Sequence, residues 1–580
     1  MSGYLLAISI GPVQDFIAAA RRTRDLWFGS YLLSEISKAT AKSVSDGGGN
    51  LIFPAPVHSQ DLNEDSLLNV ANVILAELPE TLLPQLVVRQ ARGAACARWE
   101  KEALKAMKEA NKFIDPSICQ DQISDVVEFY AAWVSVKPEQ YDKARRDVMR
   151  LLAGRKACRN FIPSKGRAGL PKSSLDGLRE TVLLPVNQIT QKDRNALRLS
   201  IGEQLDLIGL TKRFGGGKKS YPSISRIAAD PWIRKAAKNE KTQKTWEDLN
   251  LLCEELANGA GLSRIDKQQF PQFELFPYEG SILYRNRHPD LVDELDISNS
   301  QKDRLVQDIK FLEEVLQTPD PYFAILAADG DRMGKTISEI KTQDSHREFS
   351  QNLSAFARDA KNIIDKYKGS LVYSGGDDVL AFLPLDQCLS CARELHYKFC
   401  DLLKGYRDNQ GKSPTLSVGI CIGHFLEPMQ DLLGFAREAE KKAKGNDRDG
   451  FAIHLHTRGG APLYLCDSWA SGIDQRLKKW AGYHVEGLIP DKAAYDLREL
   501  ARRYESWTDT KHKEKAIGLD ARLLLSRKEK DIVKPGLDEL LNRLHDSCSI
   551  LKTAEEIIVA RRLEGCADTV APPTVEEDPV

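Results

Sequence analysis

Three aspartates of this sequence could form the centre of a catalytic site. Asp329 directly follows the apolar segment 322–328 (YFAILAA). Asp377 and Asp378 lie within the segment 370–384 (SLVYSGGDDVLAFLP). Carboxylate oxygens suit Mg²⁺ or Mn²⁺, and two such ions about 4 Å apart can activate an attacking hydroxyl group and neutralise a leaving pyrophosphate. If the three side chains meet, these residue types predict a two-metal site for phosphate chemistry.

The elements around these aspartates are expected to bring them together. Segment 322–328 is typical of a buried strand, and 370–384 of two short strands joined by a tight turn. The other elements expected here are helix 347–367, helix 385–403, strand 415–423, helix 428–444 and strand 451–456. This βαββαβ order with a final αβ is the split βαβ of a ferredoxin-like or polymerase-palm fold. The first strand and the hairpin are neighbours in such a sheet, so the carboxylates should converge at one edge.

Two other interpretations use nearly the same residues. Gly375-Gly376-Asp377-Asp378 is also a good turn sequence without any chemistry, because Gly and Asp are favoured in turns. The strand that ends at Asp329 argues against this interpretation. Residues 330–336 (GDRMGKT) are one residue short of the P-loop pattern GxxxxGK[ST]. Since a phosphate cradle depends on its loop length, a P-loop ATPase is disfavoured.

The composition is that of an ordinary globular protein. Of 580 residues, 42% are hydrophobic and 28% charged, which suits about four domains with cores of their own. The 82 basic and 83 acidic residues leave a net charge of -1, which excludes a dominant basic field that holds nucleic acid unaided. No run approaches the roughly 18 apolar residues of a membrane helix, and no basic residue precedes segment 4–10 as in a signal peptide. Eleven scattered cysteines favour reduced thiols and a cytoplasmic location.

The rest of the chain divides at breaks rich in glycine and proline. Strands are expected at 4–10 and 50–56. Helices are expected at 13–43, over most of 66–155, from residue 223 to about 316, and over 460–565. Segments 4–10 and 322–328 both enter a glycine turn and a helix, which indicates a remote repeat with Gly11 at the place of Asp329. The first copy would then lack the carboxylate and be structural.

The sequence therefore predicts an α+β protein with two ferredoxin-like or palm domains, the first of them degenerate. Helical domains are expected between and after the two palms. The expected divisions are a degenerate palm with helical insertions at 1–215, a helical linking domain at 216–317, the catalytic palm at 318–460, a C-terminal helical domain at 461–565 and a disordered tail at 566–580.

Several segments resemble a known family. ADGDRMG (328–334), YSGGDD (373–378) and AREAEKKAKGNDRDG (436–450) are similar to the palm domain of diguanylate cyclases. They are more similar still to the large polymerase/cyclase subunit of type III CRISPR effector complexes. The segments that resemble the Cmr-type (type III-B) branch are ISIGPVQDFIAAARRTRDLWFGSYLLS, LPKSSLDGLRETVL and YPSISRIAADPW. The resemblance spans about residues 1–460, and the helices that follow are compatible with that family's closing helical domain.

The resemblance implies an ATP-dependent nucleotidyltransferase. Such an enzyme joins ATP molecules through 3′–5′ phosphodiester bonds into a cyclic oligoadenylate messenger, when its complex holds guide RNA paired to target RNA. Asp329 and Asp377 would be the metal and catalytic residues, with Asp378 assisting. The nucleotide-binding residues would be Gly330, Ser374, Gly375, Gly376 and Lys444. As an exposed lysine, Lys444 could equally belong to a solvated helix surface.

The implied partners are the other subunits of a Cmr-type antiviral complex, together with guide and target RNA. Those subunits bind the 5′ end of the guide, form the backbone and form the small-subunit filament. Three alternatives stay open: transfer of AMP to another small-molecule acceptor, a catalytically silent architectural subunit, and a free-standing cyclase that makes a dinucleotide. No membrane partner is expected.

The sequence departs from the family in two places. Many relatives begin with an HD phosphohydrolase domain, whereas this sequence begins at the degenerate palm, and its His545-Asp546 lies in the expected C-terminal helices. Relatives often carry a KCxLCG zinc knuckle where this chain has Ser173 and Asp176 in place of the cysteines. Structural zinc needs thiolates or imidazoles, so no zinc is expected there. The cysteines at 388, 391 and 400 lie with His396 along one expected helix and cannot surround a tetrahedral ion.

Short basic runs could contact RNA or neighbouring subunits. They are Arg21-Arg22-Thr23-Arg24, Lys212-Arg213 and Lys218-Lys219. Such runs more commonly lie on solvent-exposed helix surfaces. The family resemblance supports the alternative expectation that they contact RNA. Trp27 and Phe28, beside the first run, are expected in the core or at a subunit contact.

Overall fold

The computed structural model is described over most of the chain. The described residues are 3–66, 68–137, 140–158, 166–190, 193–194, 199–200, 202–215, 221–295, 297–445, 447–487, 489, 491–504, 506–508, 510–526 and 547–566. Helices and two separate sheets make up these residues, so the predicted α+β class is confirmed. The expected tail at 566–580, the dipeptide His545-Asp546 and the pair Lys218-Lys219 lie outside the described residues, apart from Cys566.

A six-stranded sheet carries the three aspartates. Its order is β10-β9-β8-β5-β7-β6. The strands are β5 (Tyr322–Gly330), β6 (Ser370–Ser374), β7 (Val379–Leu383), β8 (Leu416–His424), β9 (Gly450–Leu455) and β10 (Leu463–Ser468). β5 lies in the middle, antiparallel to both β7 and β8, and its first seven residues are buried. This continuous burial explains why 322–328 is apolar throughout instead of alternating with polar residues.

Four helices accompany this sheet. They are α13 (Met333–Glu339), α14 (Gln343–Lys366), α15 (Cys388–Leu402) and α16 (Met429–Lys444). Apolar residues of α16 recur at helical spacing, and Leu432, Leu433, Ala436, Ala439 and Ala443 are all buried. α14 is amphipathic in the same way and buries Phe349, Leu353, Phe356 and Ala360. The βαββαβ order with a final αβ is confirmed, and β10 extends it.

A four-stranded sheet forms from the N-terminal part of the chain, in the order β2-β3-β1-β4. Its strands are β1 (Gly3–Gly11), β2 (Asn50–Phe53), β3 (Val73–Pro79) and β4 (Glu128–Val136). All neighbours are antiparallel, as they are in the matching strands β8-β5-β7-β6 of the larger sheet. The remote repeat predicted from segments 4–10 and 322–328 is therefore confirmed in topology. β1 and β5 occupy the same central place in their sheets.

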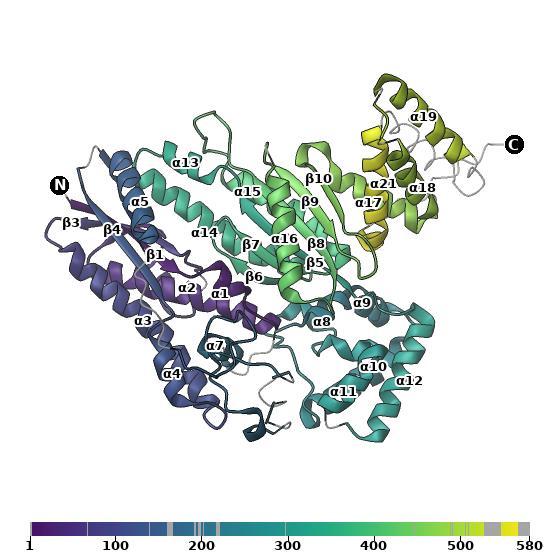
Figure 1. Cartoon of the computed structure of the whole chain (residues 1–580), viewed down its shortest axis with the longest axis horizontal. Coiled ribbons are helices and arrows are strands. Elements are labelled where there is room, and N and C mark those ends of the chain that lie inside the picture. The colour runs from purple at the N-terminus through teal and green to yellow at the C-terminus, as the bar shows by residue number, and fades with distance from the viewer. Residues whose placement is uncertain are drawn as a thin grey trace.

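Helices surround the smaller sheet, and Figure 1 shows them in purple and blue. They are α1 (Gln14–Ala18), α2 (Thr23–Asp46), α3 (Pro84–Glu109), α4 (Pro116–Ile123) and α5 (Tyr141–Ala157). The single helix expected at 13–43 is wrong, because the chain breaks between Ala18 and Thr23. There the buried ammonium of Lys212 donates hydrogen bonds to the carbonyl oxygens of Phe16 and Ala19, the latter at 3.0 Å, and closes the end of α1.

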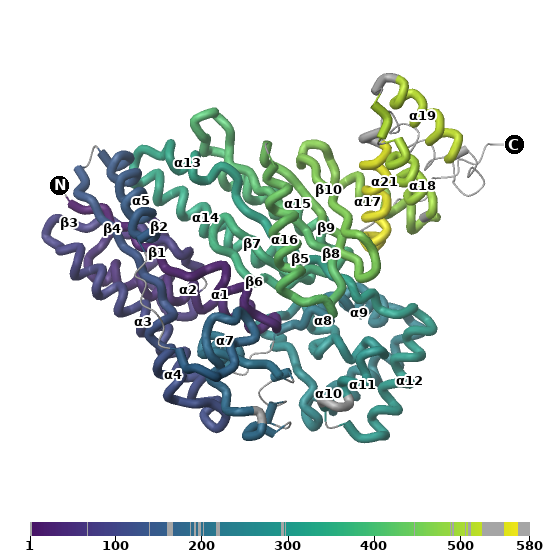
Figure 2. The backbone as a smooth tube through the Cα atoms, in the orientation of Figure 1, coloured from purple at the N-terminus to yellow at the C-terminus, as the bar shows by residue number. Residues whose placement is uncertain are grey.

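Six of the described helices follow the smaller sheet in sequence, and Figure 2 shows α8 to α12 below the larger sheet. They are α7 (Leu207–Phe214), α8 (Ile224–Ala228), α9 (Asp230–Lys238), α10 (Gln243–Gly259), α11 (His288–Glu294) and α12 (Asn299–Leu316). The helical character expected after residue 222 is confirmed.

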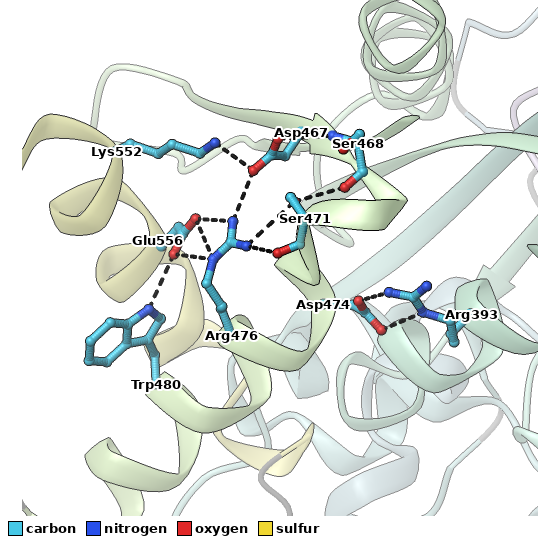
Figure 3. A network of polar contacts seen from close by, with 9 residues as sticks. All are labelled: Arg393, Asp467, Ser468, Ser471, Asp474, Arg476, Trp480, Lys552 and Glu556. Atoms are coloured by element: carbon cyan, nitrogen blue, oxygen red, sulfur yellow. Dashed lines mark hydrogen bonds and ion pairs between the residues drawn. The ribbon is translucent and has the colours of Figure 1, made fainter. Parts of the chain in front are cut away.

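The C-terminal helices pack against β10 and α15. They are α17 (Ile473–Val485), α18 (Asp491–Arg503), α19 (Thr510–Ser526) and α21 (Ser547–Arg562). Figure 3 shows the polar contacts that anchor them: Arg476 of α17 lies 3.0 Å from the carboxylate of Asp467 and 2.7 Å from that of Glu556. In the same view Arg393 of α15 donates to Asp474 of α17 over 2.7 Å. These contacts connect the helices to the larger sheet.

Three strands lie where helices were expected. β3 and β4 fall within 66–155, and β10 falls within 460–565. β4 and β10 are edge strands of their sheets and β3 is an inner strand. β10 pairs with β9 from Leu463 to Ser468, so the larger sheet continues beyond residue 460, where a helical domain was expected to begin. In these segments, pairing with neighbouring strands determines the secondary structure, and the local sequence preference for helix does not.

The two basic runs divide by burial: Arg24, Lys212 and Arg213 are buried, whereas Arg21 and Arg22 are exposed. The guanidinium of Arg213 lies 2.8 Å from Asp25 and 2.8 Å from Glu203, and all three side chains are almost fully buried. Arg24 is also buried and donates to the carbonyl oxygen of Gly215 over 2.8 Å. The expectation that these runs present charges to RNA is therefore wrong for Arg24, Lys212 and Arg213. Arg213 instead compensates the buried negative charges of Asp25 and Glu203.

Candidate active site

The structure brings Asp329, Asp377 and Asp378 together. One carboxylate oxygen from each lies within 4.8 Å of the other two. The strand register explains this, because Ala328 of β5 pairs with Val379 of β7. The residue after Ala328 and the two residues before Val379 must therefore meet at the same edge of the sheet.

Glycines allow the turn to approach β5 this closely. Gly376 has φ +106°, a backbone conformation that side-chain-bearing residues rarely adopt. A Cβ on Gly330 would stand 2.8 Å from the Cβ of Asp377 and 2.9 Å from the ring of Phe399. Gly375 stands in the same turn, and its amide donates to the carbonyl oxygen of Asp378 over 3.0 Å. The backbone geometry of the turn and its close approach to β5 therefore favour glycine at these positions, whether or not a nucleotide binds.

Ser374 ends β6, next to the turn. Its side chain is buried, and its hydroxyl has no hydrogen-bond partner within the described residues. A contact between this hydroxyl and a nucleotide stays a prediction.

The three carboxylates are crowded enough to disturb one another. Burial and repulsion by the carboxylate of Asp378 raise the pKa of Asp377 to about 7. Burial also raises the pKa of Asp378, although Arg437 of α16 opposes the change. Without a cation, Asp377 therefore keeps its proton to a higher pH than an ordinary aspartate does. A cluster of hard oxygen donors that repel one another is the donor set that Mg²⁺ and Mn²⁺ prefer, so the residues fit the expected metal.

Lys444 reaches the site from the last residue of α16. Its ammonium contacts Asp329 Oδ2 and lies 2.8 Å from Glu440 Oε1, one helical turn earlier. Burial, with the charge of Arg448 nearby, lowers the pKa of Lys444 to about 8. Burial and the carboxylate of Asp378 raise the pKa of Glu440 to about 7. Lys444 therefore lies against the three aspartates, and its contact with a nucleotide stays a prediction.

Asp331 is a further carboxylate of this region, and it is not among the residues predicted for the site. Its Oδ2 accepts hydrogen bonds from the hydroxyls of Thr415 and Ser417, each at 2.8 Å, and from the amide of Asp449 at 3.0 Å. The side chain is fully buried. It fastens the turn after β5 to β8 and to the start of β9. Two residues from Asp329, it resembles a second ligand in the sequence, but it points into the protein's own hydrogen-bond network.

The P-loop interpretation is wrong. β5 continues to Gly330 and α13 begins at Met333, so only two residues separate strand from helix. Gly334, Lys335 and Thr336 lie inside α13. No loop of the required length is left to surround a phosphate.

The segment that replaces the zinc knuckle forms a hydrogen-bonded turn. The amide of Ser173 donates to the carbonyl oxygen of Arg179 over 2.8 Å, and Lys172 lies 2.6 Å from the carboxylate of Glu180. Asp176 Oδ1 accepts from the amide of Leu178 at 3.0 Å. The cysteines at 388, 391 and 400 lie along α15, where Cys388 and Cys391 are buried. The prediction of no zinc stays a prediction.

Fold and site together define a protein of the polymerase-palm class, with its carboxylates at the edge between β5 and the β6–β7 turn. Two family models match: the N-terminal domain of the CRISPR-associated protein Cmr2 at residues 5–115, and the second palm domain of Cas10/Cmr2 at residues 322–452. These two matches support a Cmr2/Cas10-type subunit. Among the described residues, no helix is long and apolar enough to cross a membrane.

One curated relative is similar in sequence, and two solved structures are similar in fold. The CRISPR system Cmr subunit Cmr2 of Pyrococcus furiosus is 32% identical over 213 residues, which cover 31% of this chain and 23% of that protein. A cryo-EM structure of the type III-B Cmr-beta complex in its apo state contains a chain with TM-score 0.62 and 14% identity, with 96% of this chain and 82% of that chain covered. The structure bound to cognate target RNA gives TM-score 0.64 and 14% identity, with 92% and 79% covered. At this identity the likeness concerns the fold.

Proposed function

We propose that this protein is the nucleotidyltransferase subunit of an RNA-guided type III-B effector complex. Its substrate is ATP, and its product is a cyclic oligoadenylate joined by 3′–5′ phosphodiester bonds. The observation that carries the proposal is the convergence of Asp329, Asp377 and Asp378 at one edge of a palm sheet, with Lys444 against them. The Cmr2 and Cas10/Cmr2 family models support the complex and the palm.

The side chains of the site have separate tasks in this reaction. The three carboxylates would hold Mg²⁺ or Mn²⁺, which when bound supplies Lewis-acid activation of the 3′-hydroxyl and neutralises the phosphates. Lys444 contacts Asp329 Oδ2, and a bound cation would compete with its ammonium for this carboxylate. The ammonium of Lys444 can then turn to a phosphate oxygen within the reach of its side chain. Gly375 and Gly376 leave room for the backbone of the turn to approach the nucleotide.

The partners follow from the same proposal. The chain has a net charge of -1, and Arg24, Lys212 and Arg213 are buried, so these three basic side chains do not present their charge to RNA. Non-specific RNA affinity follows the number of phosphates that a protein neutralises. Guide and target RNA are therefore held mainly by other subunits of the complex, and the palm senses the target indirectly.

The test compares product formation by assembled complexes that contain wild-type or substituted protein. The complex is incubated with ATP, Mg²⁺ and target RNA, and the products are identified by mass spectrometry. Asp329→Ala and the double variant Asp377→Ala/Asp378→Ala should lose more than about a hundredfold in rate, because loss of a metal ligand's supporting partner alone costs about 10–100-fold. Target-RNA binding should stay unchanged. The control is Asp401→Ala, an exposed carboxylate of α15 that contacts only Lys404 within the described residues.

Each result has a defined meaning. Cyclic oligoadenylates from the wild-type complex and none from the variants support the proposal. An AMP adduct of another small molecule would keep the site but change the acceptor. No nucleotide product from the wild-type complex would leave an architectural subunit, and undiminished product from the aspartate variants would overturn the site assignment.

A further inference from the structure

A strained turn lies directly behind Lys444. Arg448 and Asp449 have φ +61° and +52°, so two consecutive residues with side chains adopt the left-handed conformation. Such residues persist only where the surrounding structure holds them, and they cluster at functional sites. The turn connects the end of α16 to β9, at the edge of the sheet that carries the three aspartates.

Asp449 is held at three of its atoms, each by a different element. Its amide donates to Asp331 Oδ2 over 3.0 Å. Its carboxylate oxygen Oδ1 lies 2.7 Å from Nε2 of His396 on α15, which donates to it. Its carbonyl oxygen accepts from the amide of Trp469, just after β10, at 3.0 Å. The left-handed conformation is thus fixed from the turn after β5, from α15 and from the residue that follows β10.

The same turn determines where α16 ends. The amide of Arg448 donates to the carbonyl oxygen of Lys444 over 3.0 Å. The carbonyl oxygen of Asp447 accepts from the guanidinium of Arg332 at 2.9 Å, which joins the turn to the start of α13. Because Lys444 is the last residue of α16, a shift of this turn moves its backbone and its ammonium together.

The C-terminal helices support the turn from outside. The ring of Trp469 lies 4.7 Å from the ring of His396 and 4.4 Å from the guanidinium carbon of Arg393. Arg393 is the residue that pairs with Asp474 of α17 in Figure 3. A continuous set of contacts therefore leads from α17 through Arg393, Trp469 and Asp449 to Lys444.

We propose that Asp449 is a positioning residue for nucleotidyl transfer: its three contacts hold the turn behind α16, so that Lys444 faces Asp329 and the phosphates. The inference rests on the proposed function. Misplacing a reacting group by about 1 Å can cost on the order of a hundredfold in rate. Among the described residues Asp449 contacts Asp331, His396 and Trp469 rather than the three aspartates, and it acts through Lys444.

The first test is a double-mutant cycle in the assembled, target-activated complex. Asp449→Ala should lower kcat at least about tenfold. Asp449→Asn should restore most of the rate, because asparagine tolerates the left-handed conformation and its amide oxygen accepts from His396. Combined with Lys444→Ala, Asp449→Ala should cost no more than about twofold beyond Lys444→Ala alone, since residues that act through one another are not additive. The matched control is Asp447→Ala, an exposed side chain of the same turn.

A second measurement does not depend on turnover. The rate at which an amine-reactive reagent modifies Lys444 is followed by peptide mass spectrometry of the whole protein. Contact with Asp329 and Glu440 should protect Lys444 in wild type and Asp449→Asn. The modification should be several-fold faster in Asp449→Ala, at an unchanged circular dichroism spectrum.

The two measurements separate the two proposals. Additive losses in the cycle, or equal Lys444 reactivity in folded wild type and Asp449→Ala, would overturn the positioning role. If the wild-type complex consumes no ATP, the proposed function fails, and the reactivity of Lys444 still decides whether Asp449 positions it. If Asp449→Ala does not fold, Asp449→Gly replaces it, since glycine takes the left-handed conformation and removes only the contact with His396.

Discussion

Replacing Asp377 by asparagine is expected to stabilise the protein in metal-free buffer above neutral pH, although the change removes a candidate metal ligand. The carboxylates of Asp329, Asp377 and Asp378 lie within 4.8 Å of one another. Two like charges at this separation repel by about 3.5 kcal/mol at an effective dielectric constant of about 20. The pKa of Asp377, raised to about 7 from 3.8 first by burial and then by the charge of Asp378, corresponds to about 4 kcal/mol for both causes together. Solvent at the turn lowers both values, so a gain of about 1–3 kcal/mol is expected.

The sign of the pH dependence follows from the same pKa. Below about pH 4, Asp377 is protonated in the folded and unfolded chains alike, and its charge costs nothing. Between about pH 4 and pH 7 the unfolded chain loses the proton while the folded chain keeps it, so stability falls as the pH rises. Above about pH 7 the full cost remains. The advantage of the asparagine variant should therefore be absent near pH 4 and complete near pH 8.

The assay is thermal unfolding by differential scanning fluorimetry, with chelator and then with millimolar Mg²⁺. At roughly 2–4 °C per kcal/mol for a domain of this size, Asp377→Asn should unfold about 2–12 °C higher than wild type in chelator near pH 8. Added Mg²⁺ should raise the midpoint of wild type and leave that of the variant almost unchanged. Asp401→Asn is the control, and as an exposed change it should stay within about 0.5 kcal/mol. A lower midpoint for Asp377→Asn in chelator would refute the reasoning, because Asp377 would then be a stabilising hydrogen-bond acceptor.

Four further outcomes can be measured. Mg²⁺ affinity in calorimetric titration should fall up to about tenfold per pH unit below about pH 7, because Asp377 takes up a proton that competes with the ion. Gly330→Ala should lose about 1–3 kcal/mol in chemical denaturation and also weaken Mg²⁺ binding, since its Cβ would lie 2.8 Å from that of Asp377. Arg213→Met should lose about 3–5 kcal/mol, because Asp25 and Glu203 would stay buried without their cation. The isolated protein should turn ATP over at least about tenfold more slowly than the assembled, target-bound complex at equal ATP and Mg²⁺, and equal rates would favour a free-standing enzyme.

The larger sheet could be predicted from the sequence because its signals are local. The apolar segment 322–328 has no polar interruption, and the hairpin 370–384 carries its own turn residues. The register between β5 and β7 then follows from the short turn, and with it the meeting of the three aspartates. Lys444 could be placed only through the resemblance, because its distance from Asp329 depends on how α16 packs across the sheet.

The features that were missed depend on distant partners. β4 and β10 are edge strands, and each pairs with one neighbour on one side only. Asp331 finds its partners 84, 86 and 118 residues further along the chain, so no spacing rule could separate it from a metal ligand. From the sequence, the basic pair Lys212-Arg213 is expected at the surface. Only the structure shows that Arg213 forms an ion pair with the buried carboxylate of Asp25. Sequence patterns indicate which face of a helix or strand is buried. They do not indicate which buried charged side chains form ion pairs with one another.

The ion pair between Arg213 and Asp25 also has a consequence for the order of events during synthesis. The two residues are 188 positions apart, and Asp25 is fully buried in the finished protein. At roughly 5–20 residues per second, a ribosome needs about 10–40 s between the two codons. During this interval Lys212 has not yet closed the end of α1, and α2 cannot bury its carboxylate. The burial of α1 and α2 is therefore completed late, and a nascent chain shorter than about 213 residues should be a target for chaperones that hold unfinished domains.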